Sequence, residues 1–180
     1  MRRLFRFAQS SMLMDDATWA RHANPWSVYS RMTLLPLMAL AIWSRVWIGW
    51  WALVPVLACL VWTWINPRLF ARPGRTDSWA SEGTFGERLF MQVPDDEVGA
   101  DHRRAVAILT IVNVVGAILL GYGLVALNPW ITLWGLTLTM GAKLWTFDRM
   151  VWLWREAGPS RQDASGHVIG KPRQMEASRI

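Results

Sequence analysis

The stretch AVAILTIVNVVGAILLGYGLVAL, residues 105–127, decides the fold class of this chain. No Asp, Glu, Lys, Arg or His occurs from Ala105 to Trp130. About 20 apolar residues, each rising about 1.5 Å along a helix, cross a hydrocarbon layer of about 30 Å, so the stretch predicts a membrane-spanning helix. The whole chain of 180 residues agrees, since 53% of it is hydrophobic, 14 residues are Trp, and the charges lie outside the apolar blocks.

A second predicted span follows this stretch at about 130–152. The residues between the two leave room only for a tight turn. Residues 105–152 therefore predict a transmembrane helical hairpin.

The apolar block before it, residues 25–65, is too long for one span. As one continuous helix it would extend about 60 Å, about twice the hydrocarbon layer. Between Met32 and Ile65 the only acidic or basic residue is Arg45, which lies with Ser44 in a cluster of Trp residues, as in a turn at the membrane surface. This predicts spans at about 27–44 and 47–65, which form a first hairpin over residues 24–65.

Arginine residues lie on one side of the predicted spans. Five lie in the N-terminal stretch up to Arg31, the loop between the hairpins holds six more and others lie in the C-terminal part, whereas the hairpin tips hold only Arg45. By the positive-inside rule, both termini and the central loop are cytoplasmic. The predicted fold is an all-α membrane protein with four transmembrane helices in two hairpins, with amphipathic cytoplasmic segments at 1–23 and 66–104 and a polar cytoplasmic tail at 153–180.

The sequence pI of about 10.7 follows from these basic residues at the ends of the predicted spans. They would border an anionic lipid surface, where each basic group gains about 1 kcal/mol. A nucleic-acid-binding protein would need a folded basic domain, which the sequence does not contain, so no nucleic acid partner is expected.

Three Asn-Pro pairs stand at predicted membrane boundaries, at residues 24–25, 66–67 and 128–129. Asn is a favoured N-cap residue and Pro suits the first helical position. The first and third pairs are therefore predicted to begin spans, with Trp26 and Trp130 at headgroup depth. The second pair is predicted to begin a short surface helix.

Pro36 and Pro55 are predicted to lie at similar depth in the first hairpin. Each would bend its helix and free a carbonyl, near Met32 and Trp51. Neighbouring helices can absorb such kinks, and the alternative is that the pair opens a cleft for a lipid or apolar molecule.

The central loop contains TDSWASEGTFGERLF, residues 76–90, which mixes apolar and charged residues. It predicts an amphipathic helix on the membrane surface, with Trp79, Phe85, Leu89 and Phe90 available to the lipid. Its adjacent Glu87 and Arg88 are candidates for catalysis or, more often for such a pair, solvated surface charges.

Lys143 and Asp148 are polar groups inside or near the fourth predicted span. An ionisable residue in a span is a functional candidate. Lys143 lies on the cytoplasmic half, so its stem can also extend to the headgroups as an anchor. The two alternatives are anchoring and a buried polar contact or proton or ion role.

The sequence shows no motif for a cofactor, a metal or a catalytic set. His22, His102 and His167 all lie outside the predicted spans, and a lone Cys59 forms no internal disulfide or Cys-rich site. Asp101 next to His102 is a weak metal pattern without a second nearby His. Phosphate-binding, dinucleotide-binding and nucleophile-elbow motifs are also missing.

The segments WARHANPWSVYSR, WSRVWIGWWALVPV, WINPRLF and SWAS with GERLF resemble a family of small, uncharacterised bacterial membrane proteins, a domain of unknown function. The likeness covers about residues 18–90, and its most specific element is His22-x-Asn24-Pro25-Trp26-Ser27. The resemblance implies a multi-pass protein of the bacterial inner membrane, and it implies no activity.

Two functions remain open. The first, which the missing catalytic set favours, is a non-catalytic accessory or assembly subunit that contacts membrane lipids and a membrane-protein partner or a second copy, since Trp dominates packed interfaces. The second is a small membrane enzyme or carrier that acts on a lipid-like substrate at the cytoplasmic face. The candidate headgroup or partner contacts are His22, Asn24, Trp26, Arg31, Arg68, Glu87 and Arg88.

Overall fold

The computed structural model describes residues 16–94 and 98–157, and within these ranges it holds helices and no strands. Predictions for the N-terminal residues 1–15, the acidic run 95–97 and the tail 158–180 lie outside the described residues. In chain order the elements are α2 (Asp16–His22), α3 (Pro25–Met32), α4 (Leu34–Trp43), α5 (Arg45–Ile48), the 3-10 helix η1 (Gly49–Ala52), α6 (Leu53–Leu69), α7 (Trp79–Gln92), α8 (Ala100–Ala126) and α9 (Pro129–Ala157).

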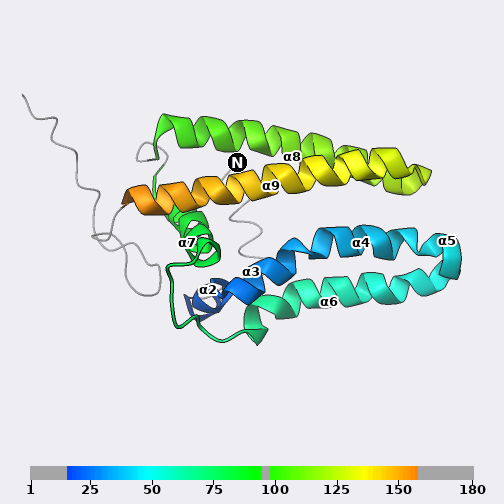
Figure 1. Cartoon of the computed structure of the whole chain (residues 1–180), viewed down its shortest axis with the longest axis horizontal. Helices are drawn as coiled ribbons and strands as arrows, with labels where there is room; N and C mark the ends of the chain where they lie inside the picture. Colours follow the sequence, from blue (N-terminus) through cyan, green and yellow to red (C-terminus); the bar gives the residue numbers. More distant parts are fainter. Residues whose placement is uncertain (1–15, 95–97, 158–180) are drawn as a thin grey trace, which may run out of the picture.

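The first hairpin consists of α3 and α4 running out and α6 running back (Figure 1). Asn24 caps α3 as predicted, because its side chain accepts a hydrogen bond from the Trp26 N–H at 3.0 Å and Pro25 takes the first helical position. The helix divides at Thr33, between α3 and α4. Pro36 explains this break, since it has no N–H to offer the Met32 carbonyl.

The reversal of the first hairpin extends further than the predicted turn at Ser44-Arg45. The chain continues through α5 and η1, and Gly49 adopts φ of 55°, a left-handed conformation that glycine accepts without steric cost. As a result α6 begins only at Leu53, and Pro55 lies in its first turn, where a missing N–H breaks no helical bond. The prediction that Pro36 and Pro55 form a pair of kinks is therefore wrong for Pro55.

The predicted surface helix at Asn66-Pro67 is also wrong, because α6 continues through both residues to Leu69. Asn66 is fully buried. Its side-chain amide bridges the hydroxyl groups of Ser27 and Ser30 on α3, each at 2.7 Å. A polar side chain between apolar helices thus joins the two limbs of the hairpin.

The second hairpin consists of α8 and α9, which pack along most of their length. Asn128 caps α9 as predicted, since its side-chain oxygen accepts a hydrogen bond from the Ile131 N–H at 3.1 Å. The helices approach closely at Gly116, where an added Cβ would lie 2.7 Å from the backbone nitrogen of Thr139. Gly121 on the same helix has nothing within 4 Å of an added Cβ.

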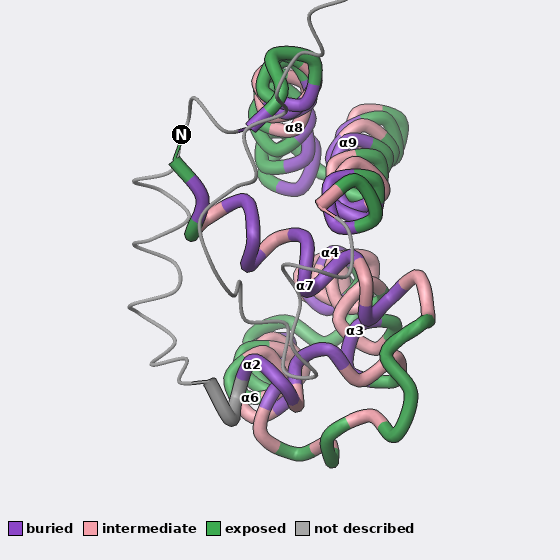
Figure 2. Tube along the Cα trace, turned by 90° about the vertical axis from the view of Figure 1, so that its left-hand side faces the viewer, coloured by how far each residue is buried: buried purple, intermediate pink, exposed green. Residues whose placement is uncertain are grey.

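Helix α7 is buried in the protein, so the prediction of a surface helix with its apolar side chains in lipid is wrong. It packs against the C-terminal part of α9, and Figure 2 shows buried residues along it. Phe85 and Leu89 are each 3% exposed, and the Phe85 ring lies 5.1 Å from the Trp154 ring. The main apolar core therefore lies around α7, at one end of the molecule. We call this end, with α2 and the adjoining ends of α8 and α9, the polar end.

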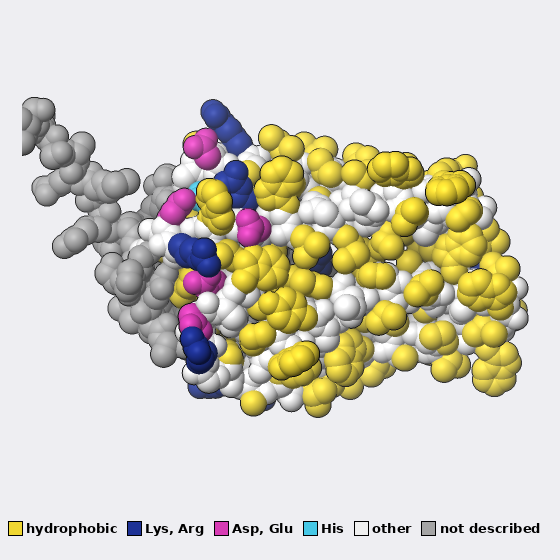
Figure 3. All heavy atoms as spheres, viewed as in Figure 1, with side chains coloured by type: hydrophobic (Ala, Val, Ile, Leu, Met, Phe, Trp, Pro, Cys, Tyr) yellow, Lys and Arg dark blue, Asp and Glu magenta, His cyan; other side chains and the backbone are white. Residues whose placement is uncertain are grey.

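The opposite end, formed by α5, η1 and the turn between α8 and α9, is the tip end. In Figure 3 charged side chains gather at the polar end, and hydrophobic side chains cover most of the rest of the visible surface. Within the described ranges two helical stretches, Pro25–Leu69 and Ala100–Ala126, are long and apolar enough to cross a membrane. The first of them contains the reversal at Gly49.

Candidate functional site: a cavity lined by charged residues

A cavity of about 480 Å³ lies where the first hairpin meets α7 and the second hairpin. Helices from every part of the described chain contribute to it, so it exists only in the folded protein. Its charged or titratable lining residues are His22 from α2, Arg31 from α3, Glu87 from α7 and Lys143 from α9.

Arg31 holds α2 against α3. Its Nε donates to the Ser27 carbonyl at 3.1 Å and one Nη donates to the His22 carbonyl at 3.4 Å, while the other Nη contacts His22 Nε2. Since guanidinium only donates hydrogen bonds, Nε2 is the accepting nitrogen of His22 and the ring proton is on Nδ1. The Arg31 contact therefore selects the tautomer of His22.

His22 is held in its neutral form. Burial lowers the pKa of its imidazole well below the usual value, and the positive charges of Arg31 and Lys143 lower this pKa further. A neutral imidazole with its proton on Nδ1 presents a hydrogen-bond donor. The site thus contains an uncharged donor beside two cations.

Two buried N–H groups of cavity-lining residues have no hydrogen-bond partner among the described residues. They are His22 Nδ1 and Trp19 Nε1, on side chains of residues that are each 5% exposed. A buried polar group without a partner costs about 1–3 kcal/mol, so such groups call for an explanation. Both groups lie on residues that line the cavity, but the N–H atoms themselves are closed to a water-sized molecule.

Glu87 is the acidic side chain in the lining. Burial raises the pKa of its carboxyl group, and the charges of Arg31 and Lys143 oppose that rise. Within the described ranges no group of three or more His, Cys, Asp or Glu residues is placed to hold a metal ion. The lining contains the cations Arg31 and Lys143 and the single acidic residue Glu87, so it carries an excess of positive charge.

The remaining polar residues of the lining are occupied by the backbone. Asn113 donates to the Thr139 carbonyl at 3.0 Å, and the Thr63 and Thr139 hydroxyls donate to carbonyls one turn earlier. The other lining residues are apolar, and they are Val28, Met32, Leu34, Leu35, Met91, Met140, Leu144 and Phe147. The cavity is therefore lined by both charged and apolar side chains.

Four of the nine candidate residues from the sequence meet at this cavity, namely His22, Arg31, Glu87 and Lys143. The other five serve elsewhere. Asn24 also donates to the Ala71 carbonyl at 2.9 Å, Trp26 is 74% exposed, and Arg88 is buried but does not line the cavity. Arg68 donates to the Trp64 carbonyl at 2.6 Å, and Asp148 accepts from Trp79 Nε1 at 2.9 Å.

Sequence reasoning missed Trp19 and Asn113 as lining residues. The sequence contains an indication for both residues. Trp19 precedes His22 by three positions and therefore lies on the same face of the helix. Asn113 is an amide inside an otherwise apolar span, where polar side chains are costly.

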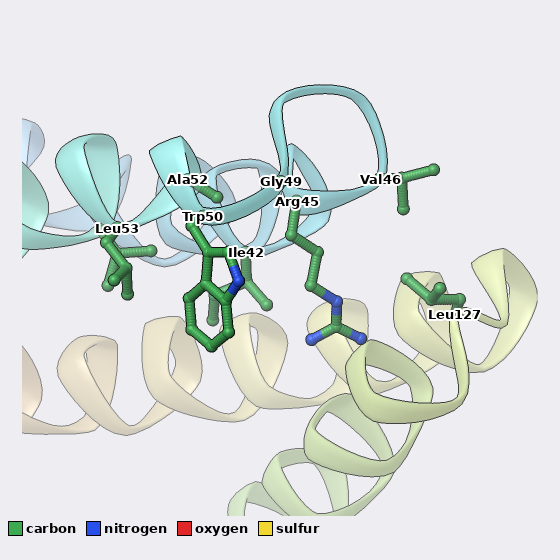
Figure 4. Close-up of a pocket in the computed structure, with 9 residues that line it drawn as sticks. Ile42, Arg45, Val46, Gly49, Trp50, Ala52, Leu53 and Leu127 are labelled. Carbon is green, nitrogen blue, oxygen red and sulfur yellow. The ribbon is translucent and has the colours of Figure 1, made fainter.

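A second cavity, of about 600 Å³, lies at the tip end between α4, α5, α6 and Leu127 (Figure 4). Its lining is mostly apolar, with Trp50 and Ile42 beside the cationic side chain of Arg45. Arg45 points toward the second hairpin and donates to backbone carbonyls of Leu124 and Val125. The Arg45 guanidinium thus stabilises the fold through these hydrogen bonds. The lining of this cavity contains fewer charged residues than the lining of the first.

Comparison with known proteins gives one match. The model of a family of unknown function, DUF6653, matches residues 5–169. The match extends well beyond residues 18–90, where the resemblance was noted from the sequence. No curated protein and no solved structure matches the chain.

Proposed function

We propose that this chain, which belongs to the family of unknown function DUF6653, is a four-span membrane protein that binds an amphiphilic, lipid-like molecule in the cavity lined by His22, Arg31, Glu87 and Lys143. The observation that carries the proposal is the meeting, in one cavity, of charged groups from four helices with an apolar wall. Binding sites for small molecules typically combine an apolar lining with a few polar groups and measure about 300–1,000 Å³.

The exposed Trp residues support four spans. On α9 the exposed Trp130 and Trp134 lie toward the tip end, and the exposed Trp145 and Trp152 lie toward the polar end. The outermost two, Trp130 and Trp152, lie 22 positions apart, which is about 33 Å along the helix at about 1.5 Å per residue. Two aromatic belts at this spacing match the two surfaces of a bilayer.

In this proposal the polar end is cytoplasmic and the membrane is the bacterial inner membrane. The support is the Arg-rich polar end and the tip end with Arg45 alone, by the positive-inside rule. The cavity, which lies between the two hairpins and α7, would then lie on the side of the inner leaflet.

The topology is tested with single cysteines. Cys59 is replaced by Ser, and Cys is placed at Thr76, between α6 and α7, or at the exposed Val46 in α5. A membrane-impermeant maleimide should label Val46→Cys in spheroplasts and Thr76→Cys only in inverted vesicles. Labelling of both positions from the same side would contradict the four-span arrangement.

Ligand binding is tested by filling the cavity. Leu35 lines it, whereas Leu37 on the same helix α4 is 51% exposed. Native mass spectrometry of the protein purified in mild detergent should show a retained amphiphile in the wild type and in Leu37→Trp, and its loss in Leu35→Trp. Equal retention in all three proteins, with all three folded by thermal unfolding, would place the amphiphile elsewhere and sink the proposal.

A second candidate is the non-catalytic accessory subunit that the sequence favours. The observation in its favour is the loose contact between the hairpins, since α4 contacts α8 and α9 at few positions. A helix of a membrane-protein partner, or of a second copy, fits such a seam. A stoichiometric partner that co-purifies in mild detergent would favour this role, and a monodisperse protein that retains an amphiphile would favour the binding role.

A further inference from the structure

We infer that the ligand of the cavity is an amphiphile with a single alkyl chain and an anionic headgroup, either a carboxylate or a phosphate ester. This inference rests on the proposed function and narrows it to one class of molecule. The argument uses the hydrogen-bonding inventory, the charge balance and the size of the cavity.

The polar side chains that line the cavity supply many hydrogen-bond donors and few acceptors. Arg31 uses three of its five N–H groups on Ser27 and His22, which leaves two. Lys143 has an ammonium group with three N–H donors, for which the described residues supply no hydrogen bond or ion pair. Trp19 and His22 also line the cavity, but their unpaired N–H groups are closed to a water-sized molecule, so the count of donors rests on Arg31 and Lys143. This inventory fits a headgroup made of acceptor oxygens.

The charge balance points to an anion. Arg31 and Lys143 carry two positive charges, Glu87 carries at most one negative charge, and His22 is neutral. Arg31 and Glu87 are partly buried and Lys143 is exposed, and one further negative charge in the cavity would complement the excess positive charge of the lining. A neutral amphiphile would leave this imbalance in place.

The size of the cavity indicates one chain. At about 30 Å³ for each water-sized group, a volume of about 480 Å³ holds about sixteen such groups. That is enough for a headgroup and one medium-length alkyl chain within the cavity. The apolar wall of Leu34, Leu35, Met140 and Leu144 provides the surface for the chain.

The test is a binding assay on the full chain in non-ionic detergent, read by native mass spectrometry and isothermal calorimetry. The probes are dodecanoate, dodecyl phosphate, dodecanol and inorganic phosphate. Both anionic amphiphiles should bind at least tenfold more tightly than dodecanol, and inorganic phosphate should not bind at the same concentration. The ranking of the two anions identifies the headgroup.

Charge variants test which residue binds the anionic headgroup. Lys143→Met should weaken dodecanoate binding about tenfold and leave dodecanol binding unchanged, and Lys143→Arg should restore it. Arg149→Met is the matched control, because Arg149 lies on the same helix, outside the lining, over the Trp152 ring. It should bind dodecanoate like the wild type.

The experiment distinguishes failure of this inference from failure of the proposed function. If dodecanol binds as tightly as dodecanoate, or Lys143→Met changes nothing, the inference of an anion is overturned and amphiphile binding stands. If inorganic phosphate binds as well as dodecyl phosphate, the site is one for free anions and the inference falls. If none of the alkyl probes binds, the proposed function falls with it.

Discussion

Arg45 and Leu124 join the two hairpins at the tip end, although they lie 79 positions apart in the chain. The Arg45 guanidinium donates to the Leu124 carbonyl at 2.5 Å and to the Val125 carbonyl at 3.2 Å. These carbonyls belong to the last turn of α8, where a helix lacks internal donors and carries partial negative charge. The basic residue at the hairpin tips is thus a helix cap supplied by the other hairpin.

Replacing Arg45 by Met should therefore destabilise the fold. Hydrogen bonds that involve a charged group contribute about 1.5–3 kcal/mol, so the free energy of unfolding should fall by about that amount. Thermal unfolding in mild detergent measures it, with Arg68→Met as a control cation outside the contact between hairpins. An unfolding midpoint for Arg45→Met equal to that of the control would contradict the structural role.

Asn66→Leu should destabilise the first hairpin. The substitution leaves the hydroxyl groups of Ser27 and Ser30 without the amide that bridges them, one of them in a fully buried residue. The expected loss is about 1–3 kcal/mol in the free energy of unfolding. Denaturant titration measures it, and the triple variant Ser27→Ala, Ser30→Ala, Asn66→Leu should recover part of the loss, since no buried hydroxyl then lacks a partner. A triple variant less stable than Asn66→Leu would speak against this account.

Gly116→Ala and Gly121→Ala form a matched pair on α8. The added methyl at Gly116 would lie 2.7 Å from the Thr139 backbone nitrogen and force the helices apart, which should cost about 1–3 kcal/mol. At Gly121 nothing lies within 4 Å of the added methyl, so stability should stay the same or improve by up to about 1 kcal/mol. Unfolding midpoints of the two variants decide it, and equal midpoints would mean that α8 and α9 do not pack as described.

Glu87→Gln should stabilise the protein at neutral pH. The pKa of Glu87 is raised in the folded state by burial, so the folded protein holds this proton more tightly than the unfolded chain. Stability then falls as pH rises from the ordinary value of 4.5 through the raised pKa, and the loss remains above it. The variant, which does not ionise, should match the wild type near pH 4 and exceed it near pH 8.

A pH series of unfolding midpoints checks this sign. Glu82→Gln is the control, because Glu82 pairs with Arg155 at 2.7 Å and gains nothing from neutralisation. If the wild type became more stable than Glu87→Gln as pH rose, the paired charges of the cavity would outweigh burial and the prediction would fail.

The sequence was sufficient to predict the helical hairpins because the information is local. Hydrophobic runs, Asn caps and a charge-free stretch each act within a few residues, and residues 105–127 with Asn128 formed the predicted helix and turn. The boundary at Leu53 was missed since Gly49 looks like any other glycine until its φ is known. Both hairpins were thus accessible from pattern alone.

The contacts of α7 and Asn66 could not be predicted from the sequence. An amphipathic helix has the same pattern whether its apolar face meets lipid or another helix, so Phe85 and Leu89 could not reveal that they pack against α9. Asn66 next to Pro67 looked like a helix start, and only the approach of Ser27 shows it as a link between helices. Four candidate residues from the sequence line the cavity, but their meeting there and the contribution of Trp19 required the tertiary structure.

The burial of α7 against α9 has a consequence for synthesis of the protein. Phe85 leaves the ribosome well before Trp154, its ring partner in the finished fold. At about 5–20 residues per second, the nascent α7 waits for several seconds without its partner. An amphipathic helix can shelter its apolar side on a bilayer surface during that interval. The final packing of α7 is therefore a late step that waits for the synthesis of α9.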